Sequence, residues 1–186
     1  MKNFSIFKHA SKFAEGLHTE HLPYLATISR KEFVDHETIT FRSTTPGIEY
    51  ALLLIENALL LNTNRAGRVY AGFQKLSAMK PIADRYMRIA DVSESLIVFG
   101  EPDWKPPRHP NVRVIPLALN FELRREWFLV ADSPTLKIAL VAQAEDKSSD
   151  PSSNKRKFSV IKTSNASAVS ELARRVEGVV DWMLVT

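Results

Sequence analysis

The chain has 186 residues, a formal net charge of +4 and no cysteine. The lack of cysteine excludes disulfide bonds, thiol catalysis and metal or iron–sulfur sites built on thiolates. Hydrophobic residues make up 45% and charged residues 25% of the chain, a balance that fits one globular domain with a sizeable core. The mild positive charge favours anionic partners, but the short basic clusters are not interleaved with aromatic residues, so nucleic-acid binding is not expected.

Residues 3–17 are predicted to form a short amphipathic helix, with Phe4, Phe7 and Ala14 on an apolar stripe and lysines at polar positions. Such a helix can lie on an anionic membrane, but it lacks a strong one-sided basic face, so we favour docking on its own domain. No apolar run is long enough for a secretion signal or for a spanning helix of about 20 residues, and we expect a cytoplasmic protein. The segment 22–42 has no helical period, but 38–42 alternates like an edge strand.

The clearest helix is predicted from Thr45 to about residue 62, because Thr45 can cap it and Pro46 suits its first position. Between residues 48 and 61 the strongly polar positions are Glu49, Glu56 and Asn57. A helix that is apolar around most of its circumference must be buried on several sides. Two interpretations stay open: the helix is sandwiched inside the domain, or it completes a homodimer interface with a second copy.

The rest of the chain alternates strands with helices and then continues as hairpin-connected strands. The predicted strands cover 69–73, 95–99, 112–117, 127–131, 137–144 and 158–163; the predicted helices cover 81–90 and 168–184; a proline-dense connection covers 101–110 and a polar loop 146–154. Because 127–131 and 138–142 are apolar at every position, their sheet should be covered on both faces. We therefore predict an α/β (α+β) fold: a single domain with a mixed central sheet of about five to six strands and helices on both faces.

Three dipeptides, each pairing an aromatic with a polar side chain, occur in the order Phe73-Gln74, Arg85-Tyr86 and Glu126-Trp127. With the strand end at 98–100, their order and spacing resemble the DICT family, a bacterial sensory domain named for its occurrence in diguanylate cyclases and two-component systems. The resemblance covers roughly residues 45–180. Within the family, the chain is most similar to stand-alone versions found in cyanobacteria. It implies a DICT-like sensory domain at 45–186, with 1–44 as a helix and extended segment of the same globule. The chain departs from the family pattern at 121–125, where a Pro-Leu pair is common.

The resemblance makes four side chains the candidate ligand-binding residues: Gln74, Arg85, Tyr86 and Glu126. Gln74 ends a strand on which Gly72 leaves room for a close approach, so its carboxamide either binds a ligand or caps the following loop. Arg85 lies beside the buried stripe of its helix and needs an anionic partner. We favour a structural Arg85–Glu126 bridge over ligand recognition. Trp127 should point to the opposite face from Glu126 and lie in the core.

We expect no enzyme activity, because the sequence contains no recognisable set of catalytic residues. His18 and His21 are the two histidines that lie close together in the sequence. No third potential ligand follows at a spacing typical of metal sites, so a metal site is not expected. The glycines lack the spacing of a phosphate-binding loop, and no serine stands in a nucleophile-elbow context. No cofactor can be assigned.

The resemblance implies a non-catalytic sensory or regulatory module that recognises a small molecule or a protein partner. No output domain follows in the sequence, so we expect signalling through protein–protein interaction or a change of oligomeric state. The alternative is a scaffold or assembly factor that binds another protein and has no small-molecule ligand. An open pocket lined by Gln74, Arg85 and Glu126 would favour the sensor, and closure of these side chains with an apolar patch elsewhere would favour the scaffold.

Overall fold

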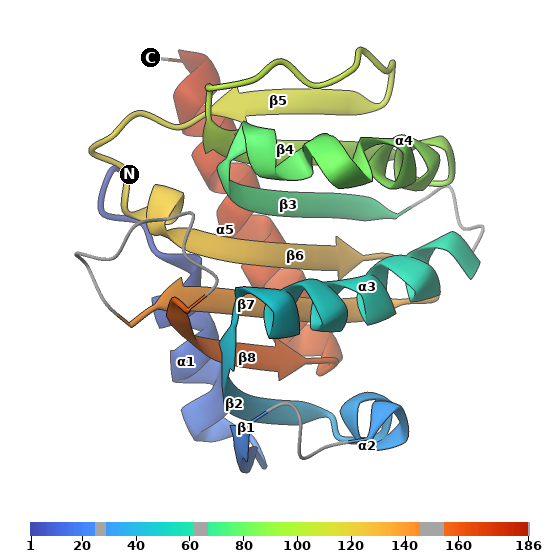
Figure 1. Ribbon diagram of the computed structural model, residues 1–186, viewed down its shortest axis with the longest axis vertical. Coiled ribbons are helices and arrows are strands. Elements are labelled where there is room, and N and C mark those ends of the chain that lie inside the picture. Colours follow the sequence, from blue (N-terminus) through green and yellow to red (C-terminus); the bar gives the residue numbers. More distant parts are fainter. Residues whose placement is uncertain (25–28, 62–66, 146–154, 186) are drawn as a thin grey trace.

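One mixed sheet of eight strands runs through the whole molecule in the order β1-β2-β8-β7-β6-β3-β4-β5 (Figure 1). The computed structural model describes residues 1–24, 29–61, 67–145 and 155–185. The strands are β1 Glu20–Tyr24, β2 Thr38–Thr44, β3 Arg68–Lys75, β4 Ser95–Glu101, β5 Val112–Pro116, β6 Glu126–Asp132, β7 Lys137–Ala144 and β8 Lys157–Thr163. The predicted loop at 146–154 and the predicted helix stop at 62–64 lie outside the described residues.

Strand direction changes from the middle of the sheet to its ends. The pairs β2–β8, β8–β7, β7–β6 and β6–β3 are antiparallel, and of these β6–β7 and β7–β8 join consecutive strands. The pairs β3–β4, β4–β5 and β1–β2 are parallel. Each parallel connection needs a crossover segment. Helices lie in the crossovers from β1 to β2 and from β3 to β4, whereas the proline-dense segment lies in that from β4 to β5.

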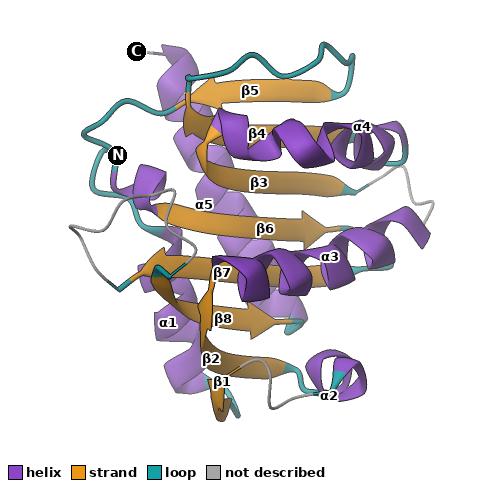
Figure 2. Cartoon of the chain, viewed as in Figure 1, coloured by secondary structure: helices purple, strands orange, loops and turns teal. Residues whose placement is uncertain are grey.

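Helices cover both faces of the sheet (Figure 2). The helices are α1 Ile6–Gly16, α2 Arg30–Asp35, α3 Thr45–Leu61, α4 Ala83–Asp91 and α5 Ala166–Val185, with short 3-10 turns η2 Leu76–Ile82 and η3 Glu122–Arg125. One apolar cluster lies between the sheet and α1 with α5, and a second between the sheet and α2, α3 and α4. The first six residues of β6 are all buried, as a strand covered on both sides requires.

The predicted fold class is confirmed, with more strands than expected. The missed strand is β1, a five-residue segment containing Pro23 that pairs with β2. Because β1 lies outside it, β2 is not the edge strand that the alternation at 38–42 predicted. Helix α2 was also missed: it spans six residues, and its start is fixed locally by a capping box between Ser29 and Glu32.

The N-terminal helix docks on its own domain, as we favoured. Its buried residues are Ile6, Ala10 and Ala14, one turn apart on one side, and they join the cluster beneath α5. No helix of the described residues is long and apolar enough to cross a membrane.

Helix α3 packs on the sheet through one side and leaves the other partly open. Ile48, Leu52 and Ile55 are buried against the sheet, with exposed fractions of 0%, 2% and 1%. On the outer side, Tyr50 is 50% exposed and Leu61 81% exposed. These two are 11 residues apart, about three helical turns, so they share one face. The helix is therefore internal on one side and presents apolar side chains on the other.

The homodimer suggested by α3 remains a prediction, and its outer face now supplies the test. We expect the protein to sediment at about twice the chain mass at micromolar concentration, because pairing of like surfaces buries such a face. Tyr50→Glu combined with Leu61→Glu should give a folded monomer, since both side chains already face solvent. Leu119→Glu is the matched control, because Leu119 is 73% exposed elsewhere on the surface. A wild-type protein that stays monomeric under these conditions contradicts the prediction.

Candidate functional site

The aromatic members of the three family dipeptides meet in the core between the sheet and α4. The Phe73 ring lies edge-on to Tyr86, with ring centroids 5.3 Å apart, and 6.5 Å from the ring of Trp127. All three side chains are at least 92% buried, because their exposed fractions are 1%, 1% and 8%. The expectation that Trp127 lies in the core, on the face opposite Glu126, is confirmed. These aromatic residues form the framework from which the polar members diverge.

Arg85 binds Glu56 of α3, so the predicted Arg85–Glu126 bridge is wrong. The Arg85 Nη1 donates to Glu56 Oε2 at 2.7 Å, and the Glu56 side chain is only 2% exposed. Burial, and next the charge of Glu56, hold the pKa of Tyr86 well above its ordinary value. The prediction failed because α4 packs beside α3, whereas Glu126 points to the other face of the sheet. The sequence does contain a feature that points to Glu56 as a partner for a cation, because it is a carboxylate on an almost wholly apolar helix.

Glu126 is closed off beneath the start of α1. Its exposed fraction is 0%, and its carboxylate accepts hydrogen bonds from Ser5 Oγ, from the backbone N–H of Ile6 at 2.9 Å and from that of Phe7 at 3.3 Å. Gln143 Nε2 donates to it at 3.3 Å. Burial raises the pKa of Glu126 to about 7, although these hydrogen bonds act in the opposite direction. The carboxylate thus satisfies the first N–H groups of α1 and ties that helix to β6.

Gln74 joins the end of β3 to two other segments. Its Nε2 donates to the Arg125 carbonyl at 2.9 Å, and its Oε1 accepts from Arg156 Nη1 at 2.8 Å. Gln74 therefore links β3 to the residue before β6 in place of capping the next loop. The room expected over Gly72 is filled, because a Cβ there would come within 2.1 Å of the Phe128 ring. The four predicted residues do not converge on one point, and a ligand role for any of them stays a prediction.

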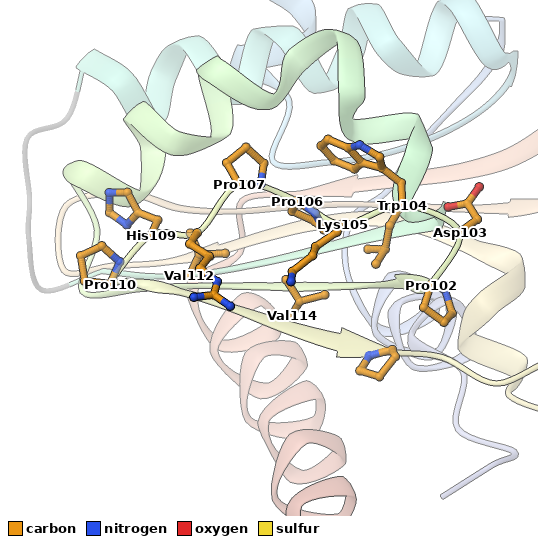
Figure 3. A pocket seen from close by; sticks show the side chains of 13 residues that line it. Pro102, Asp103, Trp104, Lys105, Pro106, Pro107, His109, Pro110, Val112 and Val114 are labelled. Atoms are coloured by element: carbon orange, nitrogen blue, oxygen red, sulfur yellow. The ribbon is translucent and has the colours of Figure 1, made fainter.

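A groove lies at the β5 edge, beneath residues 102–110, which we call the strap (Figure 3). Its volume is about 870 Å³. The walls are mostly apolar: besides the strap they comprise Leu76, Val112, Val114 and Pro116. Val112 and Val114 extend the cluster that α3 and α4 cover, so the groove lies on that face, where the strap replaces a helix. Sequence analysis predicted the proline-dense connection but not the space beneath it.

The strap is anchored at both ends. At one end, the Asp103 carboxylate accepts from the Ser77 backbone N–H at 2.9 Å and from Ser77 Oγ at 2.5 Å. At the other, His109 Nε2 lies 2.9 Å from Asp91 Oδ1 at the end of α4. Between these ends, Lys80 Nζ lies over the Trp104 ring, 6.0 Å from the ring centroid. Prolines also restrict its backbone, so the strap is fixed over the groove both by its anchored ends and by its own stiffness.

The described residues contain no group of three or more acidic or histidine side chains that could hold a metal ion. His18 lies 3.4 Å from Glu20, and His21 Nδ1 lies 2.6 Å from Thr40 Oγ1. The two histidines expected to form the close pair therefore have different partners.

The family comparison agrees with these positions. The sequence model of the DICT family, the sensory domain in diguanylate cyclases and two-component systems, matches residues 54–145. This range holds all three dipeptides, Glu56 and the strap. Residues 54–145 of the chain therefore belong to the DICT family of sensory domains.

Two solved structures are similar in fold. NucT from Helicobacter pylori is 14% identical, with 78% of this chain and 97% of that chain covered and a TM-score of 0.49. Nuc from Salmonella typhimurium, a phospholipase D family member, is 11% identical, with 76% and 93% covered and a TM-score of 0.39. Neither likeness bears on the function of this chain. No curated protein matches it.

The Glu56–Arg85 pair should show strong energetic coupling. Arg85→Ala leaves a buried carboxylate without its partner and should lower the free energy of unfolding by roughly 3 kcal/mol. Adding Glu56→Gln should cost less than the sum of the two single effects. The comparison is the cycle of Arg85→Ala with Glu126→Gln, which should be additive because those residues do not meet. Urea unfolding measures both cycles, and additivity in the first would contradict the pair.

Glu126 should make stability depend on pH. Its carboxyl ordinarily titrates at 4.5 and in the folded protein at about 7, so between these values the folded state keeps a proton that the unfolded state has lost. The free energy of unfolding should therefore fall as pH rises through this window, by roughly 3 kcal/mol from this group. Glu126→Gln removes the titrating group, so we expect wild type and variant to differ in slope between pH 4.5 and 7.

Urea unfolding across this range measures that difference. Glu49→Gln is the control, because Glu49 is exposed on α3 and should leave the wild-type slope unchanged. Parallel curves for wild type and Glu126→Gln would show that the carboxyl has no raised pKa.

Proposed function

We propose that this chain is a sensory module that binds a small molecule in the groove beneath the strap and signals through protein–protein contact. The observation that carries the proposal is the groove itself: about 870 Å³, mostly apolar and bounded by an anchored segment. Small-molecule sites in proteins are typically concave, largely preformed and roughly 300–1,000 Å³ in volume. Membership of a sensory domain family supports the same function.

Within this proposal, the family's polar positions act on the elements around the groove. The strap is tied to α4 through Asp91, and Asn111 Nδ2 donates to the Ala90 carbonyl at 3.0 Å. Helix α4 is in turn tied to α3 by Arg85 and Glu56. A ligand that shifts the strap would act on α4, and through this ion pair on α3. We infer that Arg85 and Tyr86 transmit the bound state to α3, and that Gln74 and Glu126 hold the surrounding strands and α1 in place.

The outer face of α3 is the surface that we propose for output. Exposed Tyr50 and Leu61 lie on it, and it ends the chain of contacts that begins at the strap. The same face supports the alternative of a scaffold without a small ligand, because an apolar helix face can bind another protein constitutively. The two differ in one respect: a sensor has an occupied groove, and a scaffold has no use for one.

Filling the groove should abolish ligand binding without unfolding the protein. Native mass spectrometry of protein purified from its own host should show a co-purifying small molecule in the wild type. Val114→Trp places a bulky neutral side chain in the groove and should eliminate that mass. Leu119→Trp makes the same chemical change at an exposed site and should retain it. If Val114→Trp carries the same mass as the wild type, the groove is not the site.

A further inference from the structure

We propose that the ligand of the groove is an amphipathic anion: an apolar chain or ring that carries a single carboxylate, phosphate or sulfonate. This inference rests on the proposed function and adds the chemistry of the ligand. Each ionisable side chain of the groove lining either already has a protein partner or is a cation without one.

The acidic member of the lining is already engaged. Both Asp103 oxygens accept hydrogen bonds from Ser77, one from its backbone N–H and one from its hydroxyl. His109 is engaged too, because Nε2 contacts Asp91 and Nδ1 accepts from the Asn111 backbone N–H at 3.1 Å. Both side chains hold the strap in place, so a ligand that recruited either would loosen an anchor. Asp103 keeps its negative charge, but Lys105 and Arg108 outnumber it, so the positive charge of the lining exceeds the negative charge.

The two cations of the lining are in the opposite condition. In the described part of the chain, Lys105 and Arg108 form no side-chain ion pair or hydrogen bond, although both line the groove. Figure 3 shows the Lys105 side chain extending from the strap toward Val114 on β5. A guanidinium and an ammonium beside an apolar wall provide charge-assisted donors for an acidic group.

The apolar remainder of the groove fits the other half of such a molecule. Val112, Val114, Pro116 and Leu76 offer hydrocarbon surface, and the buried Pro106 belongs to the strap above it. Burial of apolar ligand surface contributes about 25 cal/mol per Å². The anion would be held at the side where Lys105 and Arg108 lie, with its hydrocarbon along β5. A polar ion such as inorganic phosphate would leave this apolar surface uncovered.

Three probes of equal chain length separate charge from hydrophobicity: decanoate, decan-1-ol and decyltrimethylammonium, each titrated as monomers into the full chain by calorimetry. Decanoate should bind at least about tenfold more tightly than decanol, and decyltrimethylammonium most weakly. Raising the ionic strength should weaken decanoate and leave decanol unchanged, because salt screens exposed charges. Equal binding of decanoate and decanol overturns the inference while the proposed function stands.

Variants locate the anion. Lys105→Glu with Arg108→Glu should weaken decanoate about tenfold or more and change decanol by less than about twofold. Lys12→Glu, an exposed charge reversal on α1, should change neither. Val114→Trp should weaken both decanoate and decanol, because its bulk occupies the apolar wall against which both chains would lie. Unchanged decanoate binding in the double variant, or no binding of any probe, overturns the inference.

The source of the anion is separated by a vesicle arm. Phosphatidylglycerol–phosphatidylcholine vesicles present the same chemistry at a lipid surface, and flotation measures binding to them. The proposal is a free amphipathic acid, so decanoate should bind and the vesicles should not. Binding to the vesicles without binding to monomeric decanoate overturns it in favour of a membrane surface.

Discussion

The structure depends on a sheet whose central strands cannot face water on either side. In β6 and β7, successive residues are buried alternately against α1 with α5 and against α3 with α4, so both layers of helices are obligatory. Removing either layer would expose a continuous apolar surface, and each Å² exposed would lower the free energy of unfolding by about 25 cal/mol. This explains why the segment before the family match is part of the globule: α1 covers sheet that α5 alone leaves open.

Polar contacts add to the apolar packing of four of the covering helices, α1, α2, α3 and α4. Glu126 binds the first N–H groups of α1, and Glu56 joins α3 to α4 through Arg85. Lys162, which is 0% exposed, donates to the His36 carbonyl at the end of α2 at 2.5 Å. An acid at a helix N-terminus and a base at a C-terminus both complement the helix dipole. Hydrophobic burial therefore sets which elements pack together, while these contacts fix the start of α1 and the end of α2 and join α3 to α4.

Periodicity was sufficient for the parts of the fold that follow from a single segment. The run 127–131 predicted a strand buried on both faces, and period two placed Glu126 and Trp127 on opposite sides. The partner of Arg85 could not be found in this way, because it depends on which helix lies beside α4, and packing between helices is not encoded in either one alone. The sequence favoured Glu126 as the partner of Arg85 because nothing near Glu126 in the chain indicates what it binds. Its actual partner is the start of α1, more than 100 residues earlier in the chain. The same limit applies to the candidate site. Individual polar residues could be predicted from the sequence, but the groove could not, because it is formed by the strap and the edge strand β5 together.

The edge at β5 is where this architecture has room for a ligand. Elsewhere on the α3 and α4 face, the sheet is covered by helices whose side chains fill the core. Beyond β4 the cover is the strap, and a proline-rich segment with few inward side chains cannot fill the space that a helix would. The connection between parallel β4 and β5 must cross a face of the sheet, because parallel strands cannot be joined by a tight turn, and here it crosses the face that α3 and α4 cover. A crossover built from prolines instead of a helix thus completes the sheet and leaves a groove beside it, with the end of α4 bound to the strap through Asp91 and His109.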